Sequence, residues 1–346
     1  DKETRVGSIV LTFNVSDDTG GIFVKLRFDK RDGGDPRKEC NEFKNLLKPG
    51  MRLRLQGDVA PDRFAFDEMC MVPRGIMKLD AKEERMDNAE VKRVELHCHT
   101  KMSKLDGLTP MEGLVKQAIR WGHKALAITD HGAMYGAVDF YRACKAEGIH
   151  PIIGCEVYVA RRTRFDKQHE FDAESRHLVL LCKNETGYRN LSYMVSQAYI
   201  EGFYIKPRID MELLRAHSDG LIALSACLAG EIPKRLMNGD YNGAKAYALE
   251  MRGIFGEDFY LELQDHGIAE QTEVNRGLLR LHNETGIPLV CTNDAHYLRK
   301  EDAENHDVLL CIQTGKTVDD ENRMRYEPRN FYLRSTEEME ALFSGY

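Results

Sequence analysis

From about residue 91, short apolar segments recur along the chain and alternate with stretches of helical periodicity. The apolar segments cover residues 94–96, 125–128, 152–154, 178–181, 221–224, 259–263 and 289–291. Short apolar strands that alternate with helices are typical of a parallel sheet, and seven of them favour a closed or nearly closed α/β barrel. We therefore expect residues 91–300 to form one α/β barrel domain.

The first 78 residues follow a different pattern, in which apolar and polar positions alternate. The pattern predicts strands at residues 6–15, 21–28, 51–55 and 64–72, a hairpin turn at 17–21 and a helix at 36–47. Strands, one helix and further strands resemble the OB-type β-barrel, whose common ligands are single-stranded nucleic acids. A barrel that acts only as a spacer is equally compatible, because residues 1–80 hold 15 Lys and Arg against 14 Asp and Glu and therefore lack a basic groove.

A charged segment poor in apolar residues, 81–88, separates the two patterns. A length of 346 residues suits two domains. We expect an OB-type β-barrel at 1–78, a linker at 79–90, a metal-binding barrel at 91–300 and a further region that begins at 301–346.

Composition and charge limit the class of protein. Hydrophobic residues make up 42% and charged residues 30% of the chain, and no apolar run has the roughly 18 residues of a membrane span, so we expect a soluble cytoplasmic protein without membrane contact. The nine cysteines form no C-x-x-C pair, which argues against disulfides and a zinc ribbon. The net charge of −7 means that any contact with DNA is local or made by other parts of a longer chain. The non-methionine start, Asp1, and the charged segment after it indicate a piece of a longer polypeptide without a signal peptide.

Side chains that can bind metals follow most strands of the predicted barrel. His97 and His99 are two residues apart on extended backbone, so their side chains face the same way. The carboxyl ends of barrel strands gather at one mouth, which should bring the other side chains near this pair. The side chains at these strand ends and in the loops after them are His97, His99, Asp106, Asp130, His131, Glu156, Cys227, Asp265, His266, Asp294 and His296.

The donor types indicate which ions fit. Imidazole, carboxylate and a single thiol suit zinc, manganese or iron, and the number of donors exceeds what one ion can use, so we expect two or three divalent ions. Rims with several ions are typical of phosphoester hydrolysis. His177 precedes its strand, and on spacing alone we interpret it as structural. The same interpretation applies to the isolated His123, His150, His169, His217, His282 and His306.

Five short motifs carry a family resemblance. They are His97-x-His99, Thr129-Asp130-His131-Gly132, Gly154-Cys155-Glu156-Val157, Ser225-Ala226-Cys227 and Thr292-Asn293-Asp294-Ala295-His296. This set resembles the PHP (polymerase and histidinol phosphatase) domain. More closely, the chain resembles the N-terminal part of bacterial DNA polymerase III alpha subunits, the C-family replicative polymerases.

The resemblance is mixed along the chain. Residues 1 to about 130 look like the PolC type, which has an OB domain before its PHP domain, and residues from about 136 look like the DnaE type. The PolC type carries an exonuclease inserted near the position of residues 157–159, and this sequence continues without it. The missing insertion fits either a lineage without that nuclease or an engineered chain.

The resemblance implies a distorted seven-stranded barrel with nine metal ligands. These are His97, His99, Asp106, His131, Glu156, His177, Cys227, Asp294 and His296. His177 thus becomes a ligand despite its spacing, and Asp130 and His266 would lie behind the ligands or on the substrate side. By analogy with trinuclear PHP enzymes, one ion would be held by His97, His99, Glu156 and Asp294, a second by Glu156, His177 and Cys227, and a third by Asp106, His131 and His296.

The implied function is 3′→5′ exonucleolytic proofreading in part of a DNA polymerase. A metal-bound water would be the nucleophile, and no single protein side chain is assigned as base. The polymerising carboxylates would lie outside the chain, since residues 301–346 resemble the lead into the polymerase palm. Expected partners are DNA, as primer-template or single strand, the rest of the polymerase chain and other replisome subunits.

Two alternatives remain open on the sequence. The ions could only brace a scaffold on which a separate proofreading exonuclease docks. A free-standing small-molecule phosphatase is disfavoured by the OB-type unit and the palm-like tail.

Overall fold

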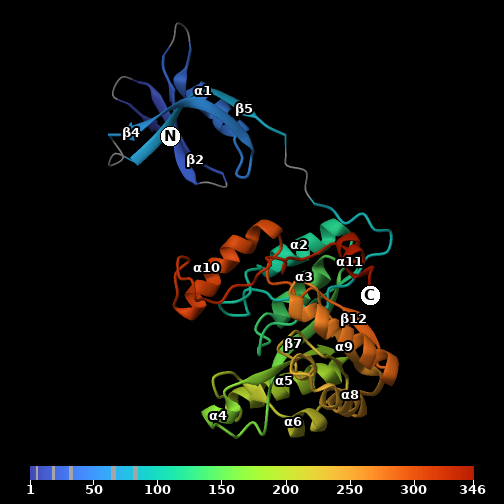
Figure 1. The fold of residues 1–346 in the computed structure, drawn as a ribbon. Coiled ribbons are helices and arrows are strands. Elements are labelled where there is room, and N and C mark those ends of the chain that lie inside the picture. Colours follow the sequence, from blue (N-terminus) through green and yellow to red (C-terminus); the bar gives the residue numbers. More distant parts are fainter. Residues whose placement is uncertain (5–6, 18–19, 31–33, 64–67, 81–84) are drawn as a thin grey trace. The chain divides into compact units, whose positions relative to one another are not determined.

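The computed structural model describes the chain except residues 5–6, 18–19, 31–33, 64–67 and 81–84. The chain forms two compact units, Asp1–Arg85 and Met86–Tyr346 (Figure 1). The middle of the predicted turn at 17–21, the start of the predicted strand at 64–72 and half of the charged segment 81–88 lie outside the described residues.

The first unit is a small sheet with one helix. Its elements are β1 (Lys2–Glu3), β2 (Ile9–Ser16), β3 (Gly21–Phe28), α1 (Pro36–Leu46), β4 (Leu53–Asp62) and β5 (Glu68–Lys78). The strand order is β1-β2-β3-β5-β4, with β3 and β5 parallel and the other pairs antiparallel. Asp35 caps α1 by accepting from the Arg37 backbone at 2.9 Å, and Cys40 packs on Ile9 and Leu11 of β2. A small β domain is therefore present, while its OB type stays a prediction.

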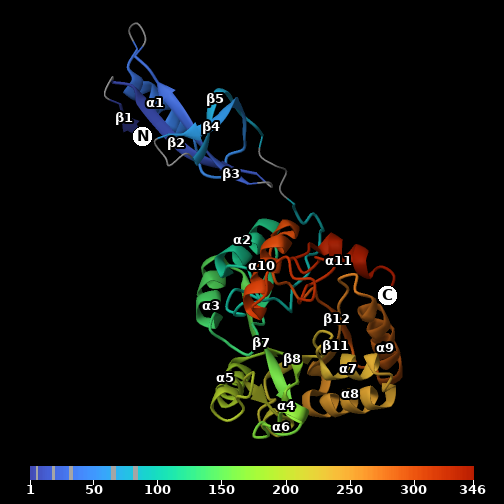
Figure 2. The same cartoon turned by 60° about the vertical axis from the view of Figure 1, so that its left-hand side comes forward.

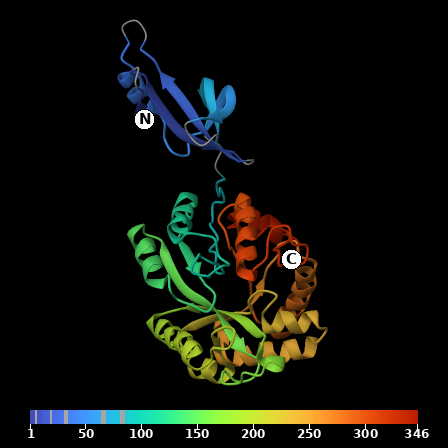
Figure 3. The ribbon, with the colours of Figure 1, turned by 90° about the vertical axis from the view of Figure 1, so that its left-hand side faces the viewer.

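The second unit is a curled sheet with helices around its outside (Figures 2 and 3). Its strands are β6 (Ala125–Ile128), β7 (His150–Ala160), β8 (Ser175–Cys182), β9 (Arg208–Ile209), β10 (Leu221–Leu224), β11 (Phe259–Leu263) and β12 (Leu289–Cys291). The strand order is β12-β11-β10-β8-β7-β6, and β9 pairs with β7. The α/β barrel-like architecture predicted from the sequence is confirmed.

Helices connect and cover these strands. They are α2 (Met111–Trp121), α3 (Ala137–Ala146), α4 (His169–Asp172), α5 (Glu185–Ile200), α6 (Met211–Ala216), α7 (Glu231–Met237), α8 (Tyr241–Phe255), α9 (Ala269–Thr285), α10 (Ala303–Thr314) and α11 (Thr336–Phe343), with 3₁₀ turns at Gly256–Asp258 and Lys300–Asp302. Small and aliphatic side chains, among them Ala127, Val179 and Leu224, fill one core cluster of the sheet. Among the described residues, no helix combines the length and the apolar character needed to cross a bilayer.

The expectation of a wholly parallel sheet is wrong at β8, which runs antiparallel to both β7 and β10. A parallel neighbour requires a crossover connection of a dozen or more residues, usually a helix. Between β7 and β8 the described helix is only the four-residue α4, and the chain returns along β7 in the opposite direction. The start of β8 therefore lies at the same sheet edge as the end of β7, where His177 pairs with Tyr158.

The predicted strand at 94–96 is also not a regular strand, but this segment closes the sheet. The backbone N–H of Ala127 donates to the carbonyl of Glu95, and that of Thr129 donates to the carbonyl of Cys98. On the other side, His99 N–H donates to the carbonyl of Ala295 at 2.8 Å. Residues 95–99 thus bridge β6 and the segment after β12 with irregular hydrogen bonds.

The C-terminal segment belongs to the same unit. The N–H of Leu333 donates to the carbonyl of Tyr297 at 2.9 Å, and the N–H of His296 donates to the carbonyl of Phe331 at 2.8 Å. At the start of α11, the Thr336 N–H and hydroxyl both donate to Asp87 at 2.8 Å, and His123 Nε2 contacts the same carboxylate oxygen at 2.8 Å. Asp87 therefore ties the start of the unit to its end.

Replacement of Asp87 by Ala should lower the stability of the unit by about 2–4 kcal/mol, because it leaves buried donors without an acceptor. Burial raises the pKa of Asp87, but hydrogen bonds from Thr336 and His123 outweigh it and hold the pKa well below its ordinary value of 3.8. The stabilisation is therefore complete above about pH 4 and is lost as the pH falls further.

Urea unfolding followed by fluorescence of Trp121, the one tryptophan of the chain and 2% exposed, measures this difference at pH 7 and below pH 4. The difference in the free energy of unfolding between wild type and Asp87→Ala should be smaller at the lower pH. The matched control is Asp139→Asn on the exposed face of α3. Equal midpoints for wild type and Asp87→Ala at pH 7 would contradict the role of Asp87.

Candidate metal centre

The carboxylate of Glu156 lies at the centre of a buried polar cluster at the edge of the sheet. This carboxylate is 1% exposed and accepts a hydrogen bond from His177 Nδ1 at 2.8 Å. His131 Nδ1 lies 2.7 Å from its other oxygen. Cys227 Sγ lies 3.7 Å from Glu156 Oε1 and 3.7 Å from His177 Nδ1. Because β8 is antiparallel, His177 reaches this cluster from the start of its strand, which the spacing argument did not foresee.

His97 and His99 approach the same carboxylate from the segment that closes the sheet. Their Nε2 atoms lie 3.6 Å and 3.4 Å from the Glu156 oxygens. Both also lie close to Asp294 Oδ1, at 3.3 Å and 3.1 Å respectively. A carboxylate on β7 and another just after β12 therefore face one pair of imidazoles.

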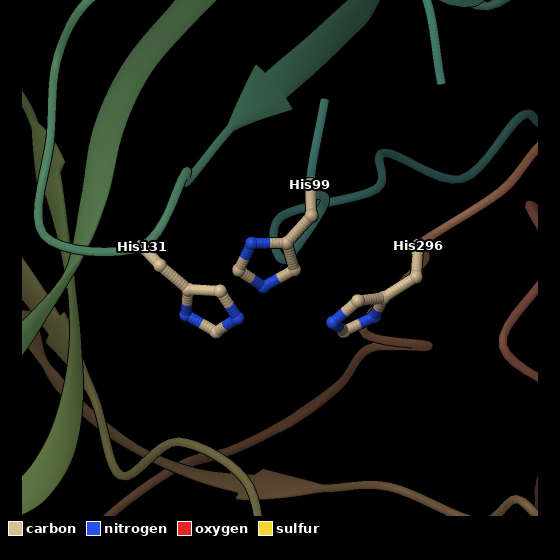
Figure 4. A group of neighbouring side chains, drawn as sticks. All are labelled: His99, His131 and His296. Atoms are coloured by element: carbon tan, nitrogen blue, oxygen red, sulfur yellow. The ribbon is translucent and has the colours of Figure 1, made fainter. Parts of the chain in front are cut away.

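A third group gathers around Asp106. His131 Nε2 lies 2.9 Å and His296 Nε2 3.8 Å from Asp106 Oδ2. The imidazoles of His99, His131 and His296 point toward one another (Figure 4), with ring centroids 4.1 Å apart for His99 and His131 and 4.4 Å apart for His99 and His296. Distances of at most 3.8 Å thus connect all nine side chains that the family resemblance implies.

Many of these atoms are buried and close together without forming hydrogen bonds. The unpartnered atoms of the cluster are His97 Nε2, His99 Nε2, Asp106 Oδ1, His131 Nδ1, Glu156 Oε2, Asp294 Oδ1, His296 Nε2 and His306 Nε2. Buried polar atoms in proteins are almost always paired, so a concentration of unpaired ones in one place needs an explanation. A bound cation requires several donors that face one common point. Three sets of residues have donor atoms that all lie within 4.8 Å of one another: His99, His131 and His296; His97, His99 and Glu156; His131, Glu156 and His177.

Hydrogen bonds donated by Nδ1 set the tautomers of three histidines. His97 Nδ1 donates to Glu262 at 2.7 Å, and His296 Nδ1 donates to the Asp294 carbonyl at 2.9 Å. The Ser103 hydroxyl donates to Asp130 at 2.8 Å, and therefore accepts from His99 Nδ1 at 2.9 Å. In each ring the lone pair is left on Nε2, the atom that faces the cluster. Such orienting partners are a regular feature of metal-bound histidines.

The carboxylates of the cluster are held ionised, and the pKa values of its imidazoles shift in opposite directions. Burial lowers the pKa of His97 and of His131, but neighbouring carboxylates outweigh it and raise the pKa of His97 well above its ordinary value and that of His131 to about 10. Burial raises the pKa of Glu156, but His177 and His131 outweigh it and bring the pKa well below its ordinary value. Burial and the neighbouring His131 and His296 lower the pKa of His99 to about 3, so its lone pair is available at neutral pH.

Cys227 behaves differently. Burial, together with Glu156 and Asp294, raises the pKa of the Cys227 thiol well above its ordinary value. A thiolate at this position therefore needs a cation beside it. The residues present fit a transition-metal centre.

Backbone strain accompanies two of the candidate ligands. Asp294 has a φ of 45° and Ala226, directly before Cys227, has a φ of 63°. The left-handed region is costly for residues other than glycine, although aspartate tolerates it better than alanine. The fold holds both turns in this region, and each one directs a donor to the cluster.

Asp130 and His266 lie outside the group of side chains that converge on the cluster. Asp130 lies behind the cluster, where it accepts from the Thr100 N–H at 2.7 Å and orients His99 through Ser103. His266 does not face the cluster. Its Nε2 donates to the Asn293 carbonyl at 2.8 Å and its Nδ1 accepts from Gln271 at 2.8 Å.

Besides Ser103, sequence reasoning missed Glu262, His306 and Tyr326, which contact the cluster or adjoin it. Glu262 lies inside β11, a short and mostly buried strand, and a single carboxylate within an apolar segment gives no periodic signal of function. His306 of α10 is 2% exposed and its Nε2 lies 3.7 Å from Asp106 Oδ1, yet an isolated histidine on a helix resembles many structural ones. Tyr326 packs edge-on against the rings of His296 and His306, at centroid distances of 5.4 Å and 5.1 Å.

Comparison with known proteins identifies the fold family of this unit. The PHP domain family matches residues 95–266. The DNA polymerase III subunit alpha of Treponema pallidum is 48% identical over 260 residues, which are 75% of this chain and 22% of that protein. The proteins of the same name from Borreliella burgdorferi and Thermus aquaticus are 44% and 46% identical over 252 and 258 residues, which are 72% and 73% of this chain and 22% and 21% of those proteins. The chain therefore spans about a fifth of the length of these curated relatives.

Replacement of Ser103 by Ala should weaken metal binding about 10- to 100-fold, because His99 loses the acceptor that fixes its tautomer. Competition with a chromophoric chelator for Zn²⁺ measures the affinity. The matched control is Ser196→Ala, since Ser196 is exposed on α5 and its hydroxyl donates to the Ser192 carbonyl. An affinity equal to that of wild type would show that Ser103 has no part in the centre.

Proposed function

Because the chain contains a PHP domain and is related in sequence to bacterial DNA polymerase III alpha subunits, we propose that it is the N-terminal region of such a subunit and removes nucleotides from DNA 3′ ends. The observation that carries the proposal is the set of buried, unpartnered donors that converge beside Glu156. The nine candidate ligands of the sequence analysis would hold two or three divalent ions, of zinc, manganese or iron.

The proposed grouping of the donors is the one that the resemblance to trinuclear PHP enzymes implies. His97, His99, Glu156 and Asp294 would hold one ion, Glu156, His177 and Cys227 a second, and Asp106, His131 and His296 a third. When bound, such ions supply Lewis acidity to a phosphate and lower the pKa of a water.

A DNA strand would approach the exposed side of the cluster. His131 and His177 are 14% and 19% exposed, whereas His97 and His99 are fully buried. Tyr158 packs against the exposed pair, with ring centroids 6.1 Å from His131 and 5.1 Å from His177. Lys206 Nζ lies 5.4 Å above the Tyr158 ring. The exposed ammonium of Lys206 beside this edge suits a phosphate of a terminal nucleotide.

The proposal extends to the cellular setting. The polymerising residues would lie in the remainder of a longer chain, and the partners would be DNA, other replisome subunits and that remainder, in the cytoplasm. The small β domain would be an OB-type unit. The rival function is a metal-braced scaffold for a separate exonuclease, and the centre also suits it, because its donors come from several distant segments of the chain.

A primer with a mismatched 3′ end separates the two functions. With added Zn²⁺ or Mn²⁺, the wild-type chain should shorten the primer, and His99→Ala should reduce the rate at least about 100-fold. His217→Ala is the matched control, because His217 lies outside the cluster and contacts Tyr193 and Asn190. Trp121 fluorescence establishes that each variant is folded. Equal cleavage by His99→Ala would identify a contaminating nuclease, and no cleavage by metal-loaded wild type would favour the scaffold.

A further inference from the structure

His306 is a buried histidine whose position the nine-residue ligand set does not explain. It lies on α10, is 2% exposed, and its Nε2 has no hydrogen-bond partner. This Nε2 lies 3.7 Å from Asp106 Oδ1, which is also buried and unpartnered. By contrast, both ring nitrogens of the buried His266 have partners.

The separation of His306 and Asp106 is informative. At 3.7 Å it is too long for a hydrogen bond. Two donors that bind one zinc ion at about 2.0–2.1 Å with tetrahedral geometry are roughly 3.4 Å apart. The other contacts between imidazole Nε2 and the carboxylates of Glu156 and Asp294 span 3.1–3.6 Å, and His296 Nε2 lies 3.8 Å from Asp106. The His306 contact therefore falls within the range of the cluster itself.

The surroundings hold the His306 ring in this orientation. Its ring contacts Tyr297 and Tyr326, with centroids 5.2 Å and 5.1 Å away, and lies edge-on to His296 at 5.6 Å. Asp106 directs Oδ2 to His131 and His296 and Oδ1 to His306. Both carboxylate oxygens thus face imidazoles.

We propose that His306 is a tenth metal donor, which binds a divalent transition-metal ion together with Asp106 and so couples α10 to the occupancy of the centre. The proposal rests on the proposed function only in requiring that the centre binds metal. Since α10 follows the last barrel strand, a ligand on this helix ties the C-terminal segment to the ion. Loss of the ion should then loosen α10.

Two measurements on the whole chain test this inference without any assay of activity. Zn²⁺ release to an excess of chelator should have one phase that is about 10- to 100-fold faster in His306→Ala than in wild type. Chelation should also raise hydrogen exchange at residues 303–314 of wild type, and this increase should vanish in His306→Ala. His217→Ala is the control for both measurements. If Trp121 fluorescence shows that His306→Ala is unfolded, His306→Gln, which keeps most of the side-chain volume, takes its place.

The outcomes separate this inference from the proposed function. If wild type binds no metal, the proposed function fails as well. If wild type binds metal and the His306 variant releases it at the wild-type rate, with the same response of α10 to chelation, His306 only packs and the inference is overturned. The inference is supported if one phase of Zn²⁺ release is faster in His306→Ala and if chelation no longer raises hydrogen exchange in α10 of that variant.

Discussion

The burial of an ionised carboxylate among imidazoles is the constraint on which the second unit depends. Glu156 is 1% exposed, and His97, His99, His131 and His177 lie within 3.6 Å of its oxygens. Burying a charge costs several kcal/mol unless partners of opposite charge compensate for it. The imidazoles compensate only in part, because most of their nearest nitrogens form no hydrogen bond. Cations at this point would satisfy both the carboxylates and the nitrogen lone pairs, which links the stability of the unit to metal binding.

The fold can be understood as the means of bringing these donors together. The irregular segment 95–99 closes the sheet and carries two imidazoles, and the antiparallel β8 places His177 at the edge where the other strands end. The left-handed residues Ala226 and Asp294 turn the chain just where Cys227 and the Asp294 carboxylate must point inward. The C-terminal segment then packs over this edge through Tyr297 and His306. Irregular backbone is thus concentrated at the candidate site, while regular strands and helices form the support.

The sequence predicted much of this arrangement, for physical reasons that also explain its errors. Apolar segments marked six of the seven barrel strands, and polar residues at their ends marked most of the cluster, because a strand end fixes where a side chain lies. Strand direction is not encoded in such spacing, so only the family resemblance predicted that His177 lies with the other candidate ligands. Glu262 and His306 leave no periodic signal in the sequence. The imidazole of His266 donates to the backbone carbonyl of Asn293 and does not face the cluster. The closing segment was expected to be a strand because extended backbone and regular strand pairing look the same in sequence.

The central question about this unit is whether the donors around Glu156 hold several ions. Elemental analysis of the purified chain after dialysis against metal-free buffer measures this number. The account requires two or three transition-metal ions per folded chain, and fewer in a folded Glu156→Ala variant, because this carboxylate is shared between two of the proposed sites. A folded wild-type chain that retains no ion, and takes up none when Zn²⁺ or Mn²⁺ is supplied, would contradict it.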